Sequence, residues 1–321
     1  MITRRLALAA AAVAAASPAM AQAYPDQPIR LIIPFAPGGP ADLIARLIGA
    51  RMGEKLGRPM VVESRSGAGG TIGVDAAAKA RPDGYTLVLA STGAMAILPH
   101  MMPSMPYDPL RDLTPIGLVL AVPQVLAIAP GLPVNNVAEL VALAKARPGT
   151  LAYGSAGTGS SLHLAGELFR LRAGIDITHV PYRGAAPAVT DLLAGRIQML
   201  LADVPILLPQ VRGGTLRALA VTGRERSDVL PDLPTMAEAG VAGVVSETWY
   251  GLLGPAGIPA DRVAILQTAL AATLREPATR EALAAQGGRI ADMDAAGFAA
   301  FIRADHTQWG EIVRTAGIRM E

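Results

Sequence analysis

The stretch IRLIIPFAPGGPADLIAR, from Ile29 to Arg46, decides the fold that we expect for this chain. Its first part, Ile29 to Phe35, is a short apolar run rich in β-branched residues, as in a buried strand. A turn rich in proline and glycine follows. Apolar residues then recur at helical spacing until Gly57, a typical C-terminal stop. The pattern predicts a strand, a tight loop and a helix that begins at Pro40.

The loop Pro37-Gly38-Gly39 allows two interpretations. Glycine lets the backbone turn sharply and lets a ligand approach it closely, and the free N–H groups of the helix start can bind an anion. The same residues also suit a plain connection between strand and helix, and this stretch alone leaves both interpretations open. We expect Asp42 to cap its own helix rather than to contact a ligand.

Residues 1–23 have the features of a secretory signal peptide. A positively charged start precedes an apolar run from Leu6 to Ala16, and small residues suited to cleavage end at Ala21 or Ala23. The run is shorter than the about 20 residues that cross a bilayer. We therefore expect export to the periplasm and cleavage after Ala21 or Ala23, by either the Sec or the twin-arginine route.

Charge and cysteine content narrow the classes of function. Once Arg4 and Arg5 leave with the signal peptide, 26 of the 28 basic residues remain against 26 acidic residues. A nearly neutral chain argues against binding nucleic acid or a membrane surface. The chain has no cysteine, which excludes disulfides, thiolate catalysis and cysteine metal sites. Roughly 300 mature residues, at about 150 per domain, suggest two domains.

Strand and helix patterns alternate along the chain, which predicts parallel sheets covered by helices. The apolar run from Leu118 to Ala129 is broken by Pro123 and is too long for one central strand, so we interpret it as a crossing between two lobes. We predict an α/β clamshell in which residues 24–122 plus 247–321 form lobe 1 and residues 123–246 form lobe 2. The ligand should lie between the carboxyl ends of the strands. The final helices should pack on lobe 1.

The predicted ligand-binding residues lie in loops that follow strands or open helices. They share backbone N–H groups, small side chains and hydroxyl groups. They are Pro37, Gly38, Gly39, Ser91, Thr92, Ser155, Thr158, Gly159, Ser160, Ser161, Tyr182, Arg183, Gly184, Ala185 and Asp203. Several helix N-termini aimed at one cleft would hold an anion without a paired cation. Four or five such contacts are enough for micromolar binding, about −8 kcal/mol.

Some of these side chains allow two roles. Arg183 could bind a carboxylate or brace the surface, and Asp203 could contact a ligand amine or form hydrogen bonds at a hinge. Ser155 lacks the first glycine of a hydrolase nucleophile elbow. His163 fits packing or capping better than catalysis, and the four histidines lack metal-ligand spacing. We predict no enzyme activity, no catalytic residue, no metal and no cofactor; a serine hydrolase using Ser155 or Ser160 is the weakest alternative.

Together these features resemble the Bug family, the periplasmic substrate-binding proteins of tripartite tricarboxylate transport systems. The matching motifs are Pro34-Phe35-Ala36-Pro37-Gly38-Gly39 with Asp42, Gly67-Ala68-Gly69-Gly70, Pro82-Asp83-Gly84-Tyr85-Thr86, Tyr107-Asp108-Pro109, His163-Leu164-Ala165-Gly166-Glu167, Val180-Pro181-Tyr182-Arg183-Gly184 and Trp249-Tyr250-Gly251. They extend over nearly the whole chain after the signal peptide.

The resemblance implies a two-lobed periplasmic-binding-protein fold, the Venus flytrap, with a mostly parallel sheet in each lobe. It also implies a small carboxylate ligand, held largely by backbone groups, hydroxyl groups and ordered water, and a membrane permease of two subunits as partner. Family ligands range over citrate-like acids, dicarboxylates, acidic amino acids and aromatic acids. Members often carry Asn near Leu98, and its absence here favours a less polar ligand. We expect a monomer, and the alternative role is a ligand-loaded co-receptor for a sensor kinase.

Overall fold

The computed structural model describes residues 24–285, 287–290 and 293–316. The predicted signal peptide, residues 1–23, lies outside the described residues. Within the described part of the chain, no helix combines the length and the apolar character needed to cross a bilayer.

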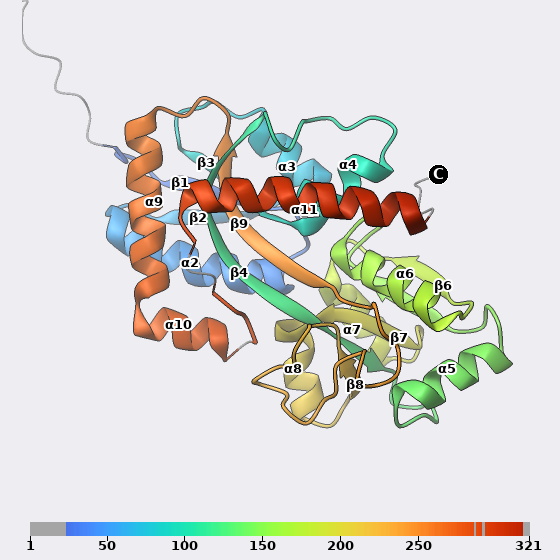
Figure 1. Ribbon diagram of the computed structural model, residues 1–321. Coiled ribbons are helices and arrows are strands. Elements are labelled where there is room, and N and C mark those ends of the chain that lie inside the picture. The colour runs from blue at the N-terminus through green and yellow to red at the C-terminus, as the bar shows by residue number, and fades with distance from the viewer. Residues whose placement is uncertain (1–23, 286, 291–292, 317–321) are drawn as a thin grey trace, which may run out of the picture.

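Nine strands form one sheet in two halves, which share the long strand β4 (Leu113–Ile128) (Figure 1). The first half-sheet has the order β2-β1-β3-β9-β4. Its other strands are β1 (Ile29–Ile33), β2 (Met60–Ser64), β3 (Thr86–Ser91) and β9 (Glu247–Pro255). In the second half-sheet β4 pairs with β7 (Met199–Asp203) and β8 (Arg217–Val221), and β7 leads on to β5 (Ala152–Ser155) and β6 (Thr178–Pro181).

Each half-sheet combines parallel and antiparallel pairs. Strand β1 runs parallel to β2 and β3, and β5 runs parallel to β6 and β7. All pairs made by β4 and β9 are antiparallel. The predicted two-lobed α/β architecture is thus present. The antiparallel pairs come from the strands that connect the halves and were not foreseen.

Helices cover both half-sheets. Those packed around the first half are α2 (Pro40–Leu56), α3 (Thr71–Ala78), α9 (Ala260–Arg275), α10 (Pro277–Ala284) and α11 (Ala295–Ala316), with the short segments η1 (Ala68–Gly70), η2 (Gly93–Ile97) and α4 (Leu98–Met101). Those of the second half are α5 (Val137–Ala146), α6 (Ser161–Ala173), α7 (Ala185–Leu193) and α8 (Val204–Arg212). The segment between Asp228 and Ser246 consists of turns and isolated bridges.

The opening strand and helix form as the sequence predicts. Alternate residues of β1 pack against one face of α2, which contributes Ile44, Ile48 and Met52. All three side chains are buried, and each such side chain stabilises the fold by about 1.5–3 kcal/mol relative to its exposed state. Helix α2 ends at Gly57, whose φ of 67° is the left-handed conformation that glycine adopts without strain.

Strand β4 changes partners at Pro123. Up to Pro123, which pairs with Glu247, it follows β9; from Gln124, which pairs with Asp203, it follows β7. The predicted crossing is therefore correct. The apolar run is nevertheless one continuous strand. It can be this long because its first part belongs to one half-sheet and its second part to the other. Thr222 closes the same junction, since its hydroxyl accepts a hydrogen bond from the Gln124 N–H (3.0 Å) and donates one to the Ser246 carbonyl (2.6 Å).

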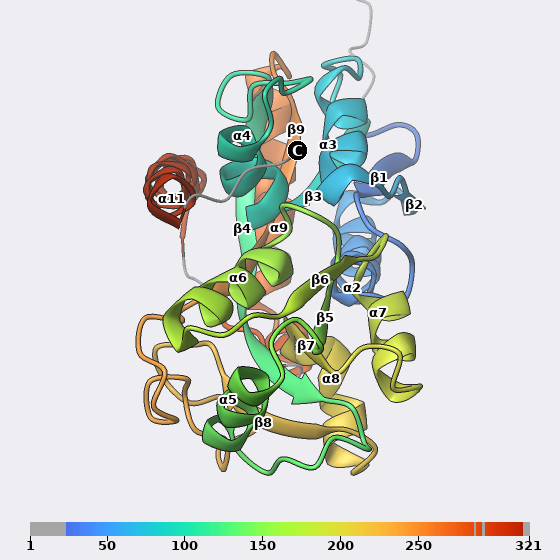
Figure 2. The ribbon, with the colours of Figure 1, turned by 90° about the vertical axis from the view of Figure 1, so that its right-hand side faces the viewer.

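Helix α11 contacts both halves rather than the first alone. Phe298 and Ile302 pack in a cluster with β3 and β9, whereas Trp309 and Val313 pack in a cluster with α6. Figure 2 shows α11 end-on beside α4 and α6. The sequence suggested packing on the first lobe because no strand follows this helix, but its length of 22 residues carries it past the junction.

Asn136, with Glu139 three residues later, has the sequence pattern of a helix capping pair, and it caps the start of α5. The Asn136 side-chain oxygen accepts a hydrogen bond from the Glu139 N–H at 2.9 Å, and the Glu139 carboxylate accepts one from the Asn136 amide at 2.8 Å. We expect Asn136→Ala to lower the free energy of unfolding in urea by about 1 kcal/mol, because an N–H group at the helix start loses its acceptor. Asn136→Ser keeps an acceptor and should restore most of the loss; equal losses in the two variants would contradict this role.

Candidate functional site

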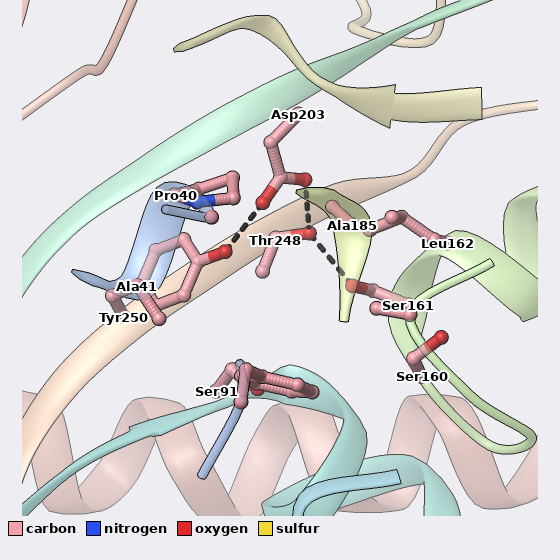
Figure 3. Close-up of a pocket in the computed structure, with 13 residues that line it drawn as sticks. Pro40, Ala41, Ser91, Ser160, Ser161, Leu162, Ala185, Asp203, Thr248 and Tyr250 are labelled. Carbon is pink, nitrogen blue, oxygen red and sulfur yellow. Dashed lines mark hydrogen bonds between the residues drawn. The ribbon is translucent and has the colours of Figure 1, made fainter. Parts of the chain in front are cut away.

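A small pocket lies between the two half-sheets (Figure 3). Residues of both halves form its wall: Phe35, Gly39, Pro40, Ala41, Ser91, Thr248 and Tyr250 from the first half, and Ala156, Ser160, Ser161, Leu162, Ala185 and Asp203 from the second. Its volume is about 20 Å³, which is room for about one water molecule. The two halves are thus closed on each other.

Three helices open onto this pocket with their N-terminal ends. Helix α2 contributes Ala41, α6 contributes Ser161 and Leu162, and α7 contributes Ala185. The N–H groups of a first helical turn have no partner within the helix, and the helix dipole gives that end a partial positive charge. Among the described residues of the pocket wall, none is Lys, Arg or His. An anion placed here would be held by N–H and hydroxyl groups.

A chain of hydrogen bonds runs across the pocket wall. The hydroxyl groups of Ser161 and Thr248 are 2.7 Å apart, and Thr248 donates to an oxygen of Asp203 at 2.6 Å. The Tyr250 hydroxyl donates to the other Asp203 oxygen, and the Gln124 amide donates to the Thr248 hydroxyl at 3.0 Å. Figure 3 shows Asp203, Thr248 and Ser161 in line, with Tyr250 on the opposite side of Asp203. The chain joins β7, β9 and the start of α6.

Asp203 is fully buried and has no cation among these partners. Burial raises the pKa of its carboxyl group to about 6, although the hydrogen bonds from Thr248, Tyr250 and Gln124 oppose that shift. Burial also raises the pKa of Tyr250 well above its usual value, so Tyr250 remains a donor near neutral pH. From the sequence, Asp203 had two possible roles, contact with a ligand amine or hydrogen bonding at a hinge. Its hydrogen bonds join β7 to β9, and it also lines the pocket.

The serine loop between β5 and α6 uses its side chains internally. The Ser160 hydroxyl caps α6 by accepting the His163 N–H at 3.3 Å. The Ser155 hydroxyl accepts the Gly157 N–H at 3.1 Å and lies 2.7 Å from Nε2 of His179. The rings of His163 and His179 stack with 4.0 Å between centroids. Ser155 is fully buried and lies outside the pocket wall, and His163 has the packed position that the sequence favoured.

Glycines allow the two halves to approach closely beside the pocket. A Cβ on Gly93 would lie 3.0 Å from the Gly159 carbonyl oxygen and 3.0 Å from the Ser160 Cα. A Cβ on Gly69 would lie 2.4 Å from the Thr158 carbonyl oxygen. Leu98 also takes part, because its side chain fills the space over Gly159. Leu98 is buried at this contact and does not line the pocket.

Six of the predicted ligand-binding residues lie in the pocket wall: Gly39, Ser91, Ser160, Ser161, Ala185 and Asp203. The others lie outside it: Pro37, Gly38, Thr92, Ser155, Thr158, Gly159, Tyr182, Arg183 and Gly184. Several have other partners. The Thr92 hydroxyl accepts the Trp249 N–H at 2.9 Å, and the Tyr182 hydroxyl donates to Asp191 at 2.7 Å. Arg183 is exposed, and its carbonyl accepts the Ala36 N–H at 3.1 Å.

The wall also contains residues that the sequence did not single out: Phe35, Pro40, Ala41, Ala156, Leu162, Thr248 and Tyr250. A usable signal existed for Thr248 and Tyr250. They alternate along a buried, mostly apolar strand, so their polar groups share one face. Polar groups on a buried strand need partners, and such partners gather at sites. Asp42 lies outside the wall and caps its own helix region, as expected, by accepting the Gly38 N–H at 2.9 Å.

Within the described ranges, no three His, Asp or Glu side chains lie close enough to hold a metal ion.

The model of the tripartite tricarboxylate transporter receptor family matches residues 44–318. The chain belongs to this family. The predicted resemblance to the Bug proteins is also confirmed: protein BugT of Bordetella pertussis is 41% identical over 309 residues, which are 95% of this chain and 94% of BugT.

Solved structures of this periplasmic binding protein family share the fold. The periplasmic binding protein BugD is 34% identical, with a TM-score of 0.90 over 93% of this chain and 100% of BugD. The R. palustris protein Rpa4515, solved with adipate, is 36% identical, with a TM-score of 0.90 over 92% and 99% of the two chains. MatC from Rhodopseudomonas palustris, solved with malate, is 30% identical, with a TM-score of 0.87 over 90% and 100%. These family members are binding proteins rather than enzymes.

The stacked histidines beside the serine loop predict a pH dependence. Burial and the neighbouring His163 lower the pKa of His179 to about 3, whereas an unfolded histidine titrates near about 6.5. The unfolded state therefore binds more protons in this range, and the free energy of unfolding should fall as the pH drops below about 6.5.

The non-titrating variant His179→Gln tests this origin, because glutamine can still bond to Ser155. In urea unfolding at pH 7 and pH 5, we expect the variant to lose less stability than the wild type. The difference should stay below about 1.4 kcal/mol per pH unit, because His179 is only partly buried. The same loss in both proteins would contradict the assignment.

Proposed function

We propose that this protein is a periplasmic solute-binding protein that captures a small carboxylate for a tripartite tricarboxylate-type transporter. The observation that supports this most is a closed pocket between two half-sheets, onto which the N-terminal ends of α2, α6 and α7 open and whose wall carries no basic side chain. Oxygen-rich anions accept several N–H groups at once, so carboxylates are the ligands that such a pocket favours.

The remainder of the wall agrees with a ligand that has an apolar body. Phe35 and Leu162 are apolar residues of the same wall as the helix-start residues Ala41 and Ala185. A linear dicarboxylate has an aliphatic chain between two such anionic ends. Two relatives bear on the choice, because Rpa4515 was solved with adipate and MatC with malate. We infer that this chain binds a small aliphatic carboxylate.

The proposal includes the cellular setting. Residues 1–23 would direct export and be cleaved after Ala21 or Ala23, and the mature monomer would deliver its ligand to a permease of two subunits. We propose that lobe 1 is residues 24–122 plus 247–321 and lobe 2 is residues 123–246. The change of partners of β4 between Pro123 and Gln124 supports this division.

Ligand entry requires the lobes to separate, since the closed pocket has room for about one water molecule. The hinge would lie where the chain crosses the junction, at Pro123 and near Thr222 and Ser246, whose hydrogen bonds join the crossing segments. Closure over a ligand is the usual mode of such two-lobed binding proteins.

Calorimetric titration with adipate and with its diamide tests the carboxylate preference. The diamide replaces acceptor oxygens by donors that face N–H groups, and each unpaired buried group costs about 1–3 kcal/mol. We expect adipate to bind about ten- to a hundredfold more tightly than the diamide. Arg183→Ala serves as a control and should change affinity little, because its side chain is exposed outside the pocket. Equal binding of acid and amide would contradict the proposal.

A second prediction concerns closure. Gly93→Val would place a branched side chain against the backbone of Gly159 and Ser160, which cannot move aside easily. Overpacking of this kind costs about 1–3 kcal/mol, so adipate should bind roughly five- to 150-fold more weakly in titration calorimetry.

The control for this prediction is Gly131→Val, since a Cβ on Gly131 meets nothing within 4 Å. This control should bind adipate as the wild type does. Unfolding temperatures without ligand should be similar in both variants, because the open form lacks the Gly93 contact. Undiminished affinity in Gly93→Val would show that closure is not required.

A further inference from the structure

Asp203 places a negative charge in the wall of a pocket that we propose for anions. Its side chain is fully buried, and its partners are neutral hydroxyl and amide groups of Thr248, Tyr250 and Gln124. No described residue of the pocket wall is a cation that could balance it. Buried charges are screened little, so an ionised Asp203 and a bound carboxylate would repel each other strongly.

The hydrogen bonds fix where the protons lie when Asp203 is ionised. A carboxylate can only accept, so Thr248 must donate its single proton to Asp203 at 2.6 Å. Ser161 must then donate to Thr248 across their 2.7 Å contact. The Ser161 oxygen therefore has only lone pairs left for the pocket, and lone pairs repel the oxygens of a carboxylate ligand.

Protonation of Asp203 reverses the direction of these hydrogen bonds. A protonated Asp203 donates to the Thr248 oxygen, which also accepts from Gln124 and so has both lone pairs occupied. Thr248 then donates to Ser161, and Ser161 is free to donate into the pocket.

We propose that the pocket binds its carboxylate ligand together with one proton, which Asp203 holds. The proposal rests on the proposed function and adds the charge state of the complex. The proton comes from the solvent, and the only bond formed is the O–H bond of Asp203. Protonation removes the opposing charge and gives the ligand a hydroxyl donor on Ser161. Asp203 thereby determines how much negative charge the site accepts.

Other titratable groups on the elements around Asp203 are already paired elsewhere. On β9, the Glu247 carboxylate is paired with Arg289 at 2.9 Å, and on α2 Asp42 is paired with Arg46 at 2.8 Å. Tyr250 of β9 contacts Asp203 and stays protonated because its pKa is raised.

The titratable groups of the second half-sheet near Asp203 also have partners elsewhere. On α6, the His163 ring accepts the Gly159 N–H at 3.1 Å, and Glu167 is bound by Arg170 of α6 and by Tyr153 of β5. On α7, Asp191 binds Tyr182 and Arg196, and Arg212 of α8 donates to the Val229 carbonyl. The pKa of Asp203, which burial raises to about 6, places its proton exchange in the range where ligand binding can be measured.

The experiment is titration calorimetry with adipate between pH 5.5 and 8.5, in pairs of buffers that differ in ionisation enthalpy. The second carboxyl group of adipate titrates between about pH 5 and 6, so adipate is almost fully ionised from about pH 7 upward, and proton uptake in that part of the range belongs to the protein. We expect affinity to fall by up to tenfold per pH unit above about 6, since binding and proton uptake are reciprocally linked. The heat difference between buffers should show uptake approaching one proton for each adipate bound.

Three variants assign the effect to Asp203. In Asp203→Asn the amide can donate to Thr248 and still accept from Tyr250, so adipate should bind without proton uptake and with little dependence on pH. Thr248→Val interrupts the chain to Ser161 and should weaken binding at pH 6 relative to the wild type. Asp305→Asn is the matched control. Its carboxyl group is half-buried and has a pKa that desolvation raises to about 6, but it accepts the Trp249 indole N–H outside the pocket wall. The Asp305→Asn variant should take up as many protons on binding adipate as the wild type does.

Adipate binding by the wild type with no proton uptake and no change between pH 6 and 8 would overturn the inference. Loss of binding in a folded Asp203→Asn at every pH would also overturn it. Tighter binding of glutamate than adipate, strengthening towards pH 8, would assign Asp203 to a ligand ammonium group instead. The proposed function itself fails if no carboxylate binds at any pH or if adipate and its diamide bind equally, so the two failures are distinguishable.

Discussion

The pairing of β4 with β9 before Pro123, and with β7 after it, joins the two half-sheets beside the pocket and places Asp203, Thr248 and Tyr250 in its wall. Asp203 and Gln124 face each other in this ladder, and Thr248 and Tyr250 lie on the neighbouring strand β9. The polar chain from Tyr250 to Ser161 is therefore built at the point where the two half-sheets join. A change in the angle between the halves must alter that chain, and a change in the chain must alter the preferred angle.

The pocket combines two kinds of electrostatic interaction. Fixed N–H groups at the starts of α2, α6 and α7 supply a constant partial positive charge, because they belong to the backbone. The hydroxyl groups of Ser161 and Thr248 are variable, since the direction of their hydrogen bonds follows the protonation of Asp203. In the carboxylate complex that we propose, backbone groups set the sign of the ligand charge, whereas the side-chain network adjusts the strength of binding.

Local patterns predicted the parts of the structure that depend on near neighbours. The strand and helix around Pro40, the cap at Asn136 and the crossing at Pro123 follow from short-range rules and are present. Ser161 and Ala185 could be predicted because they lie at the starts of helices, which have free N–H groups in any fold. Both residues line the pocket. The pairing of strands that are distant in the sequence could not be predicted from local patterns.

Thr248 and Tyr250 reach the pocket only because β9 returns to pair with β4, some 120 residues earlier in the chain. Arg183 is a different case. The sequence left it open between binding a carboxylate and bracing the surface; its side chain is exposed outside the pocket wall, and its backbone carbonyl accepts the Ala36 N–H. The antiparallel pairs were missed for the same reason, since composition does not tell which distant strands become neighbours.

The central position of β9 has a consequence for how the molecule is made. Strand β9 lies between β3 and β4, so residues 247–255 must arrive before the first half-sheet is complete. Until then β3 and β4 each expose an unpaired edge, and such edges bind other extended chains. Contacts this distant in sequence also form slowly. The first half-sheet is therefore completed only when most of the chain has been synthesised, whereas all the strands of the second half-sheet precede β9 in the chain.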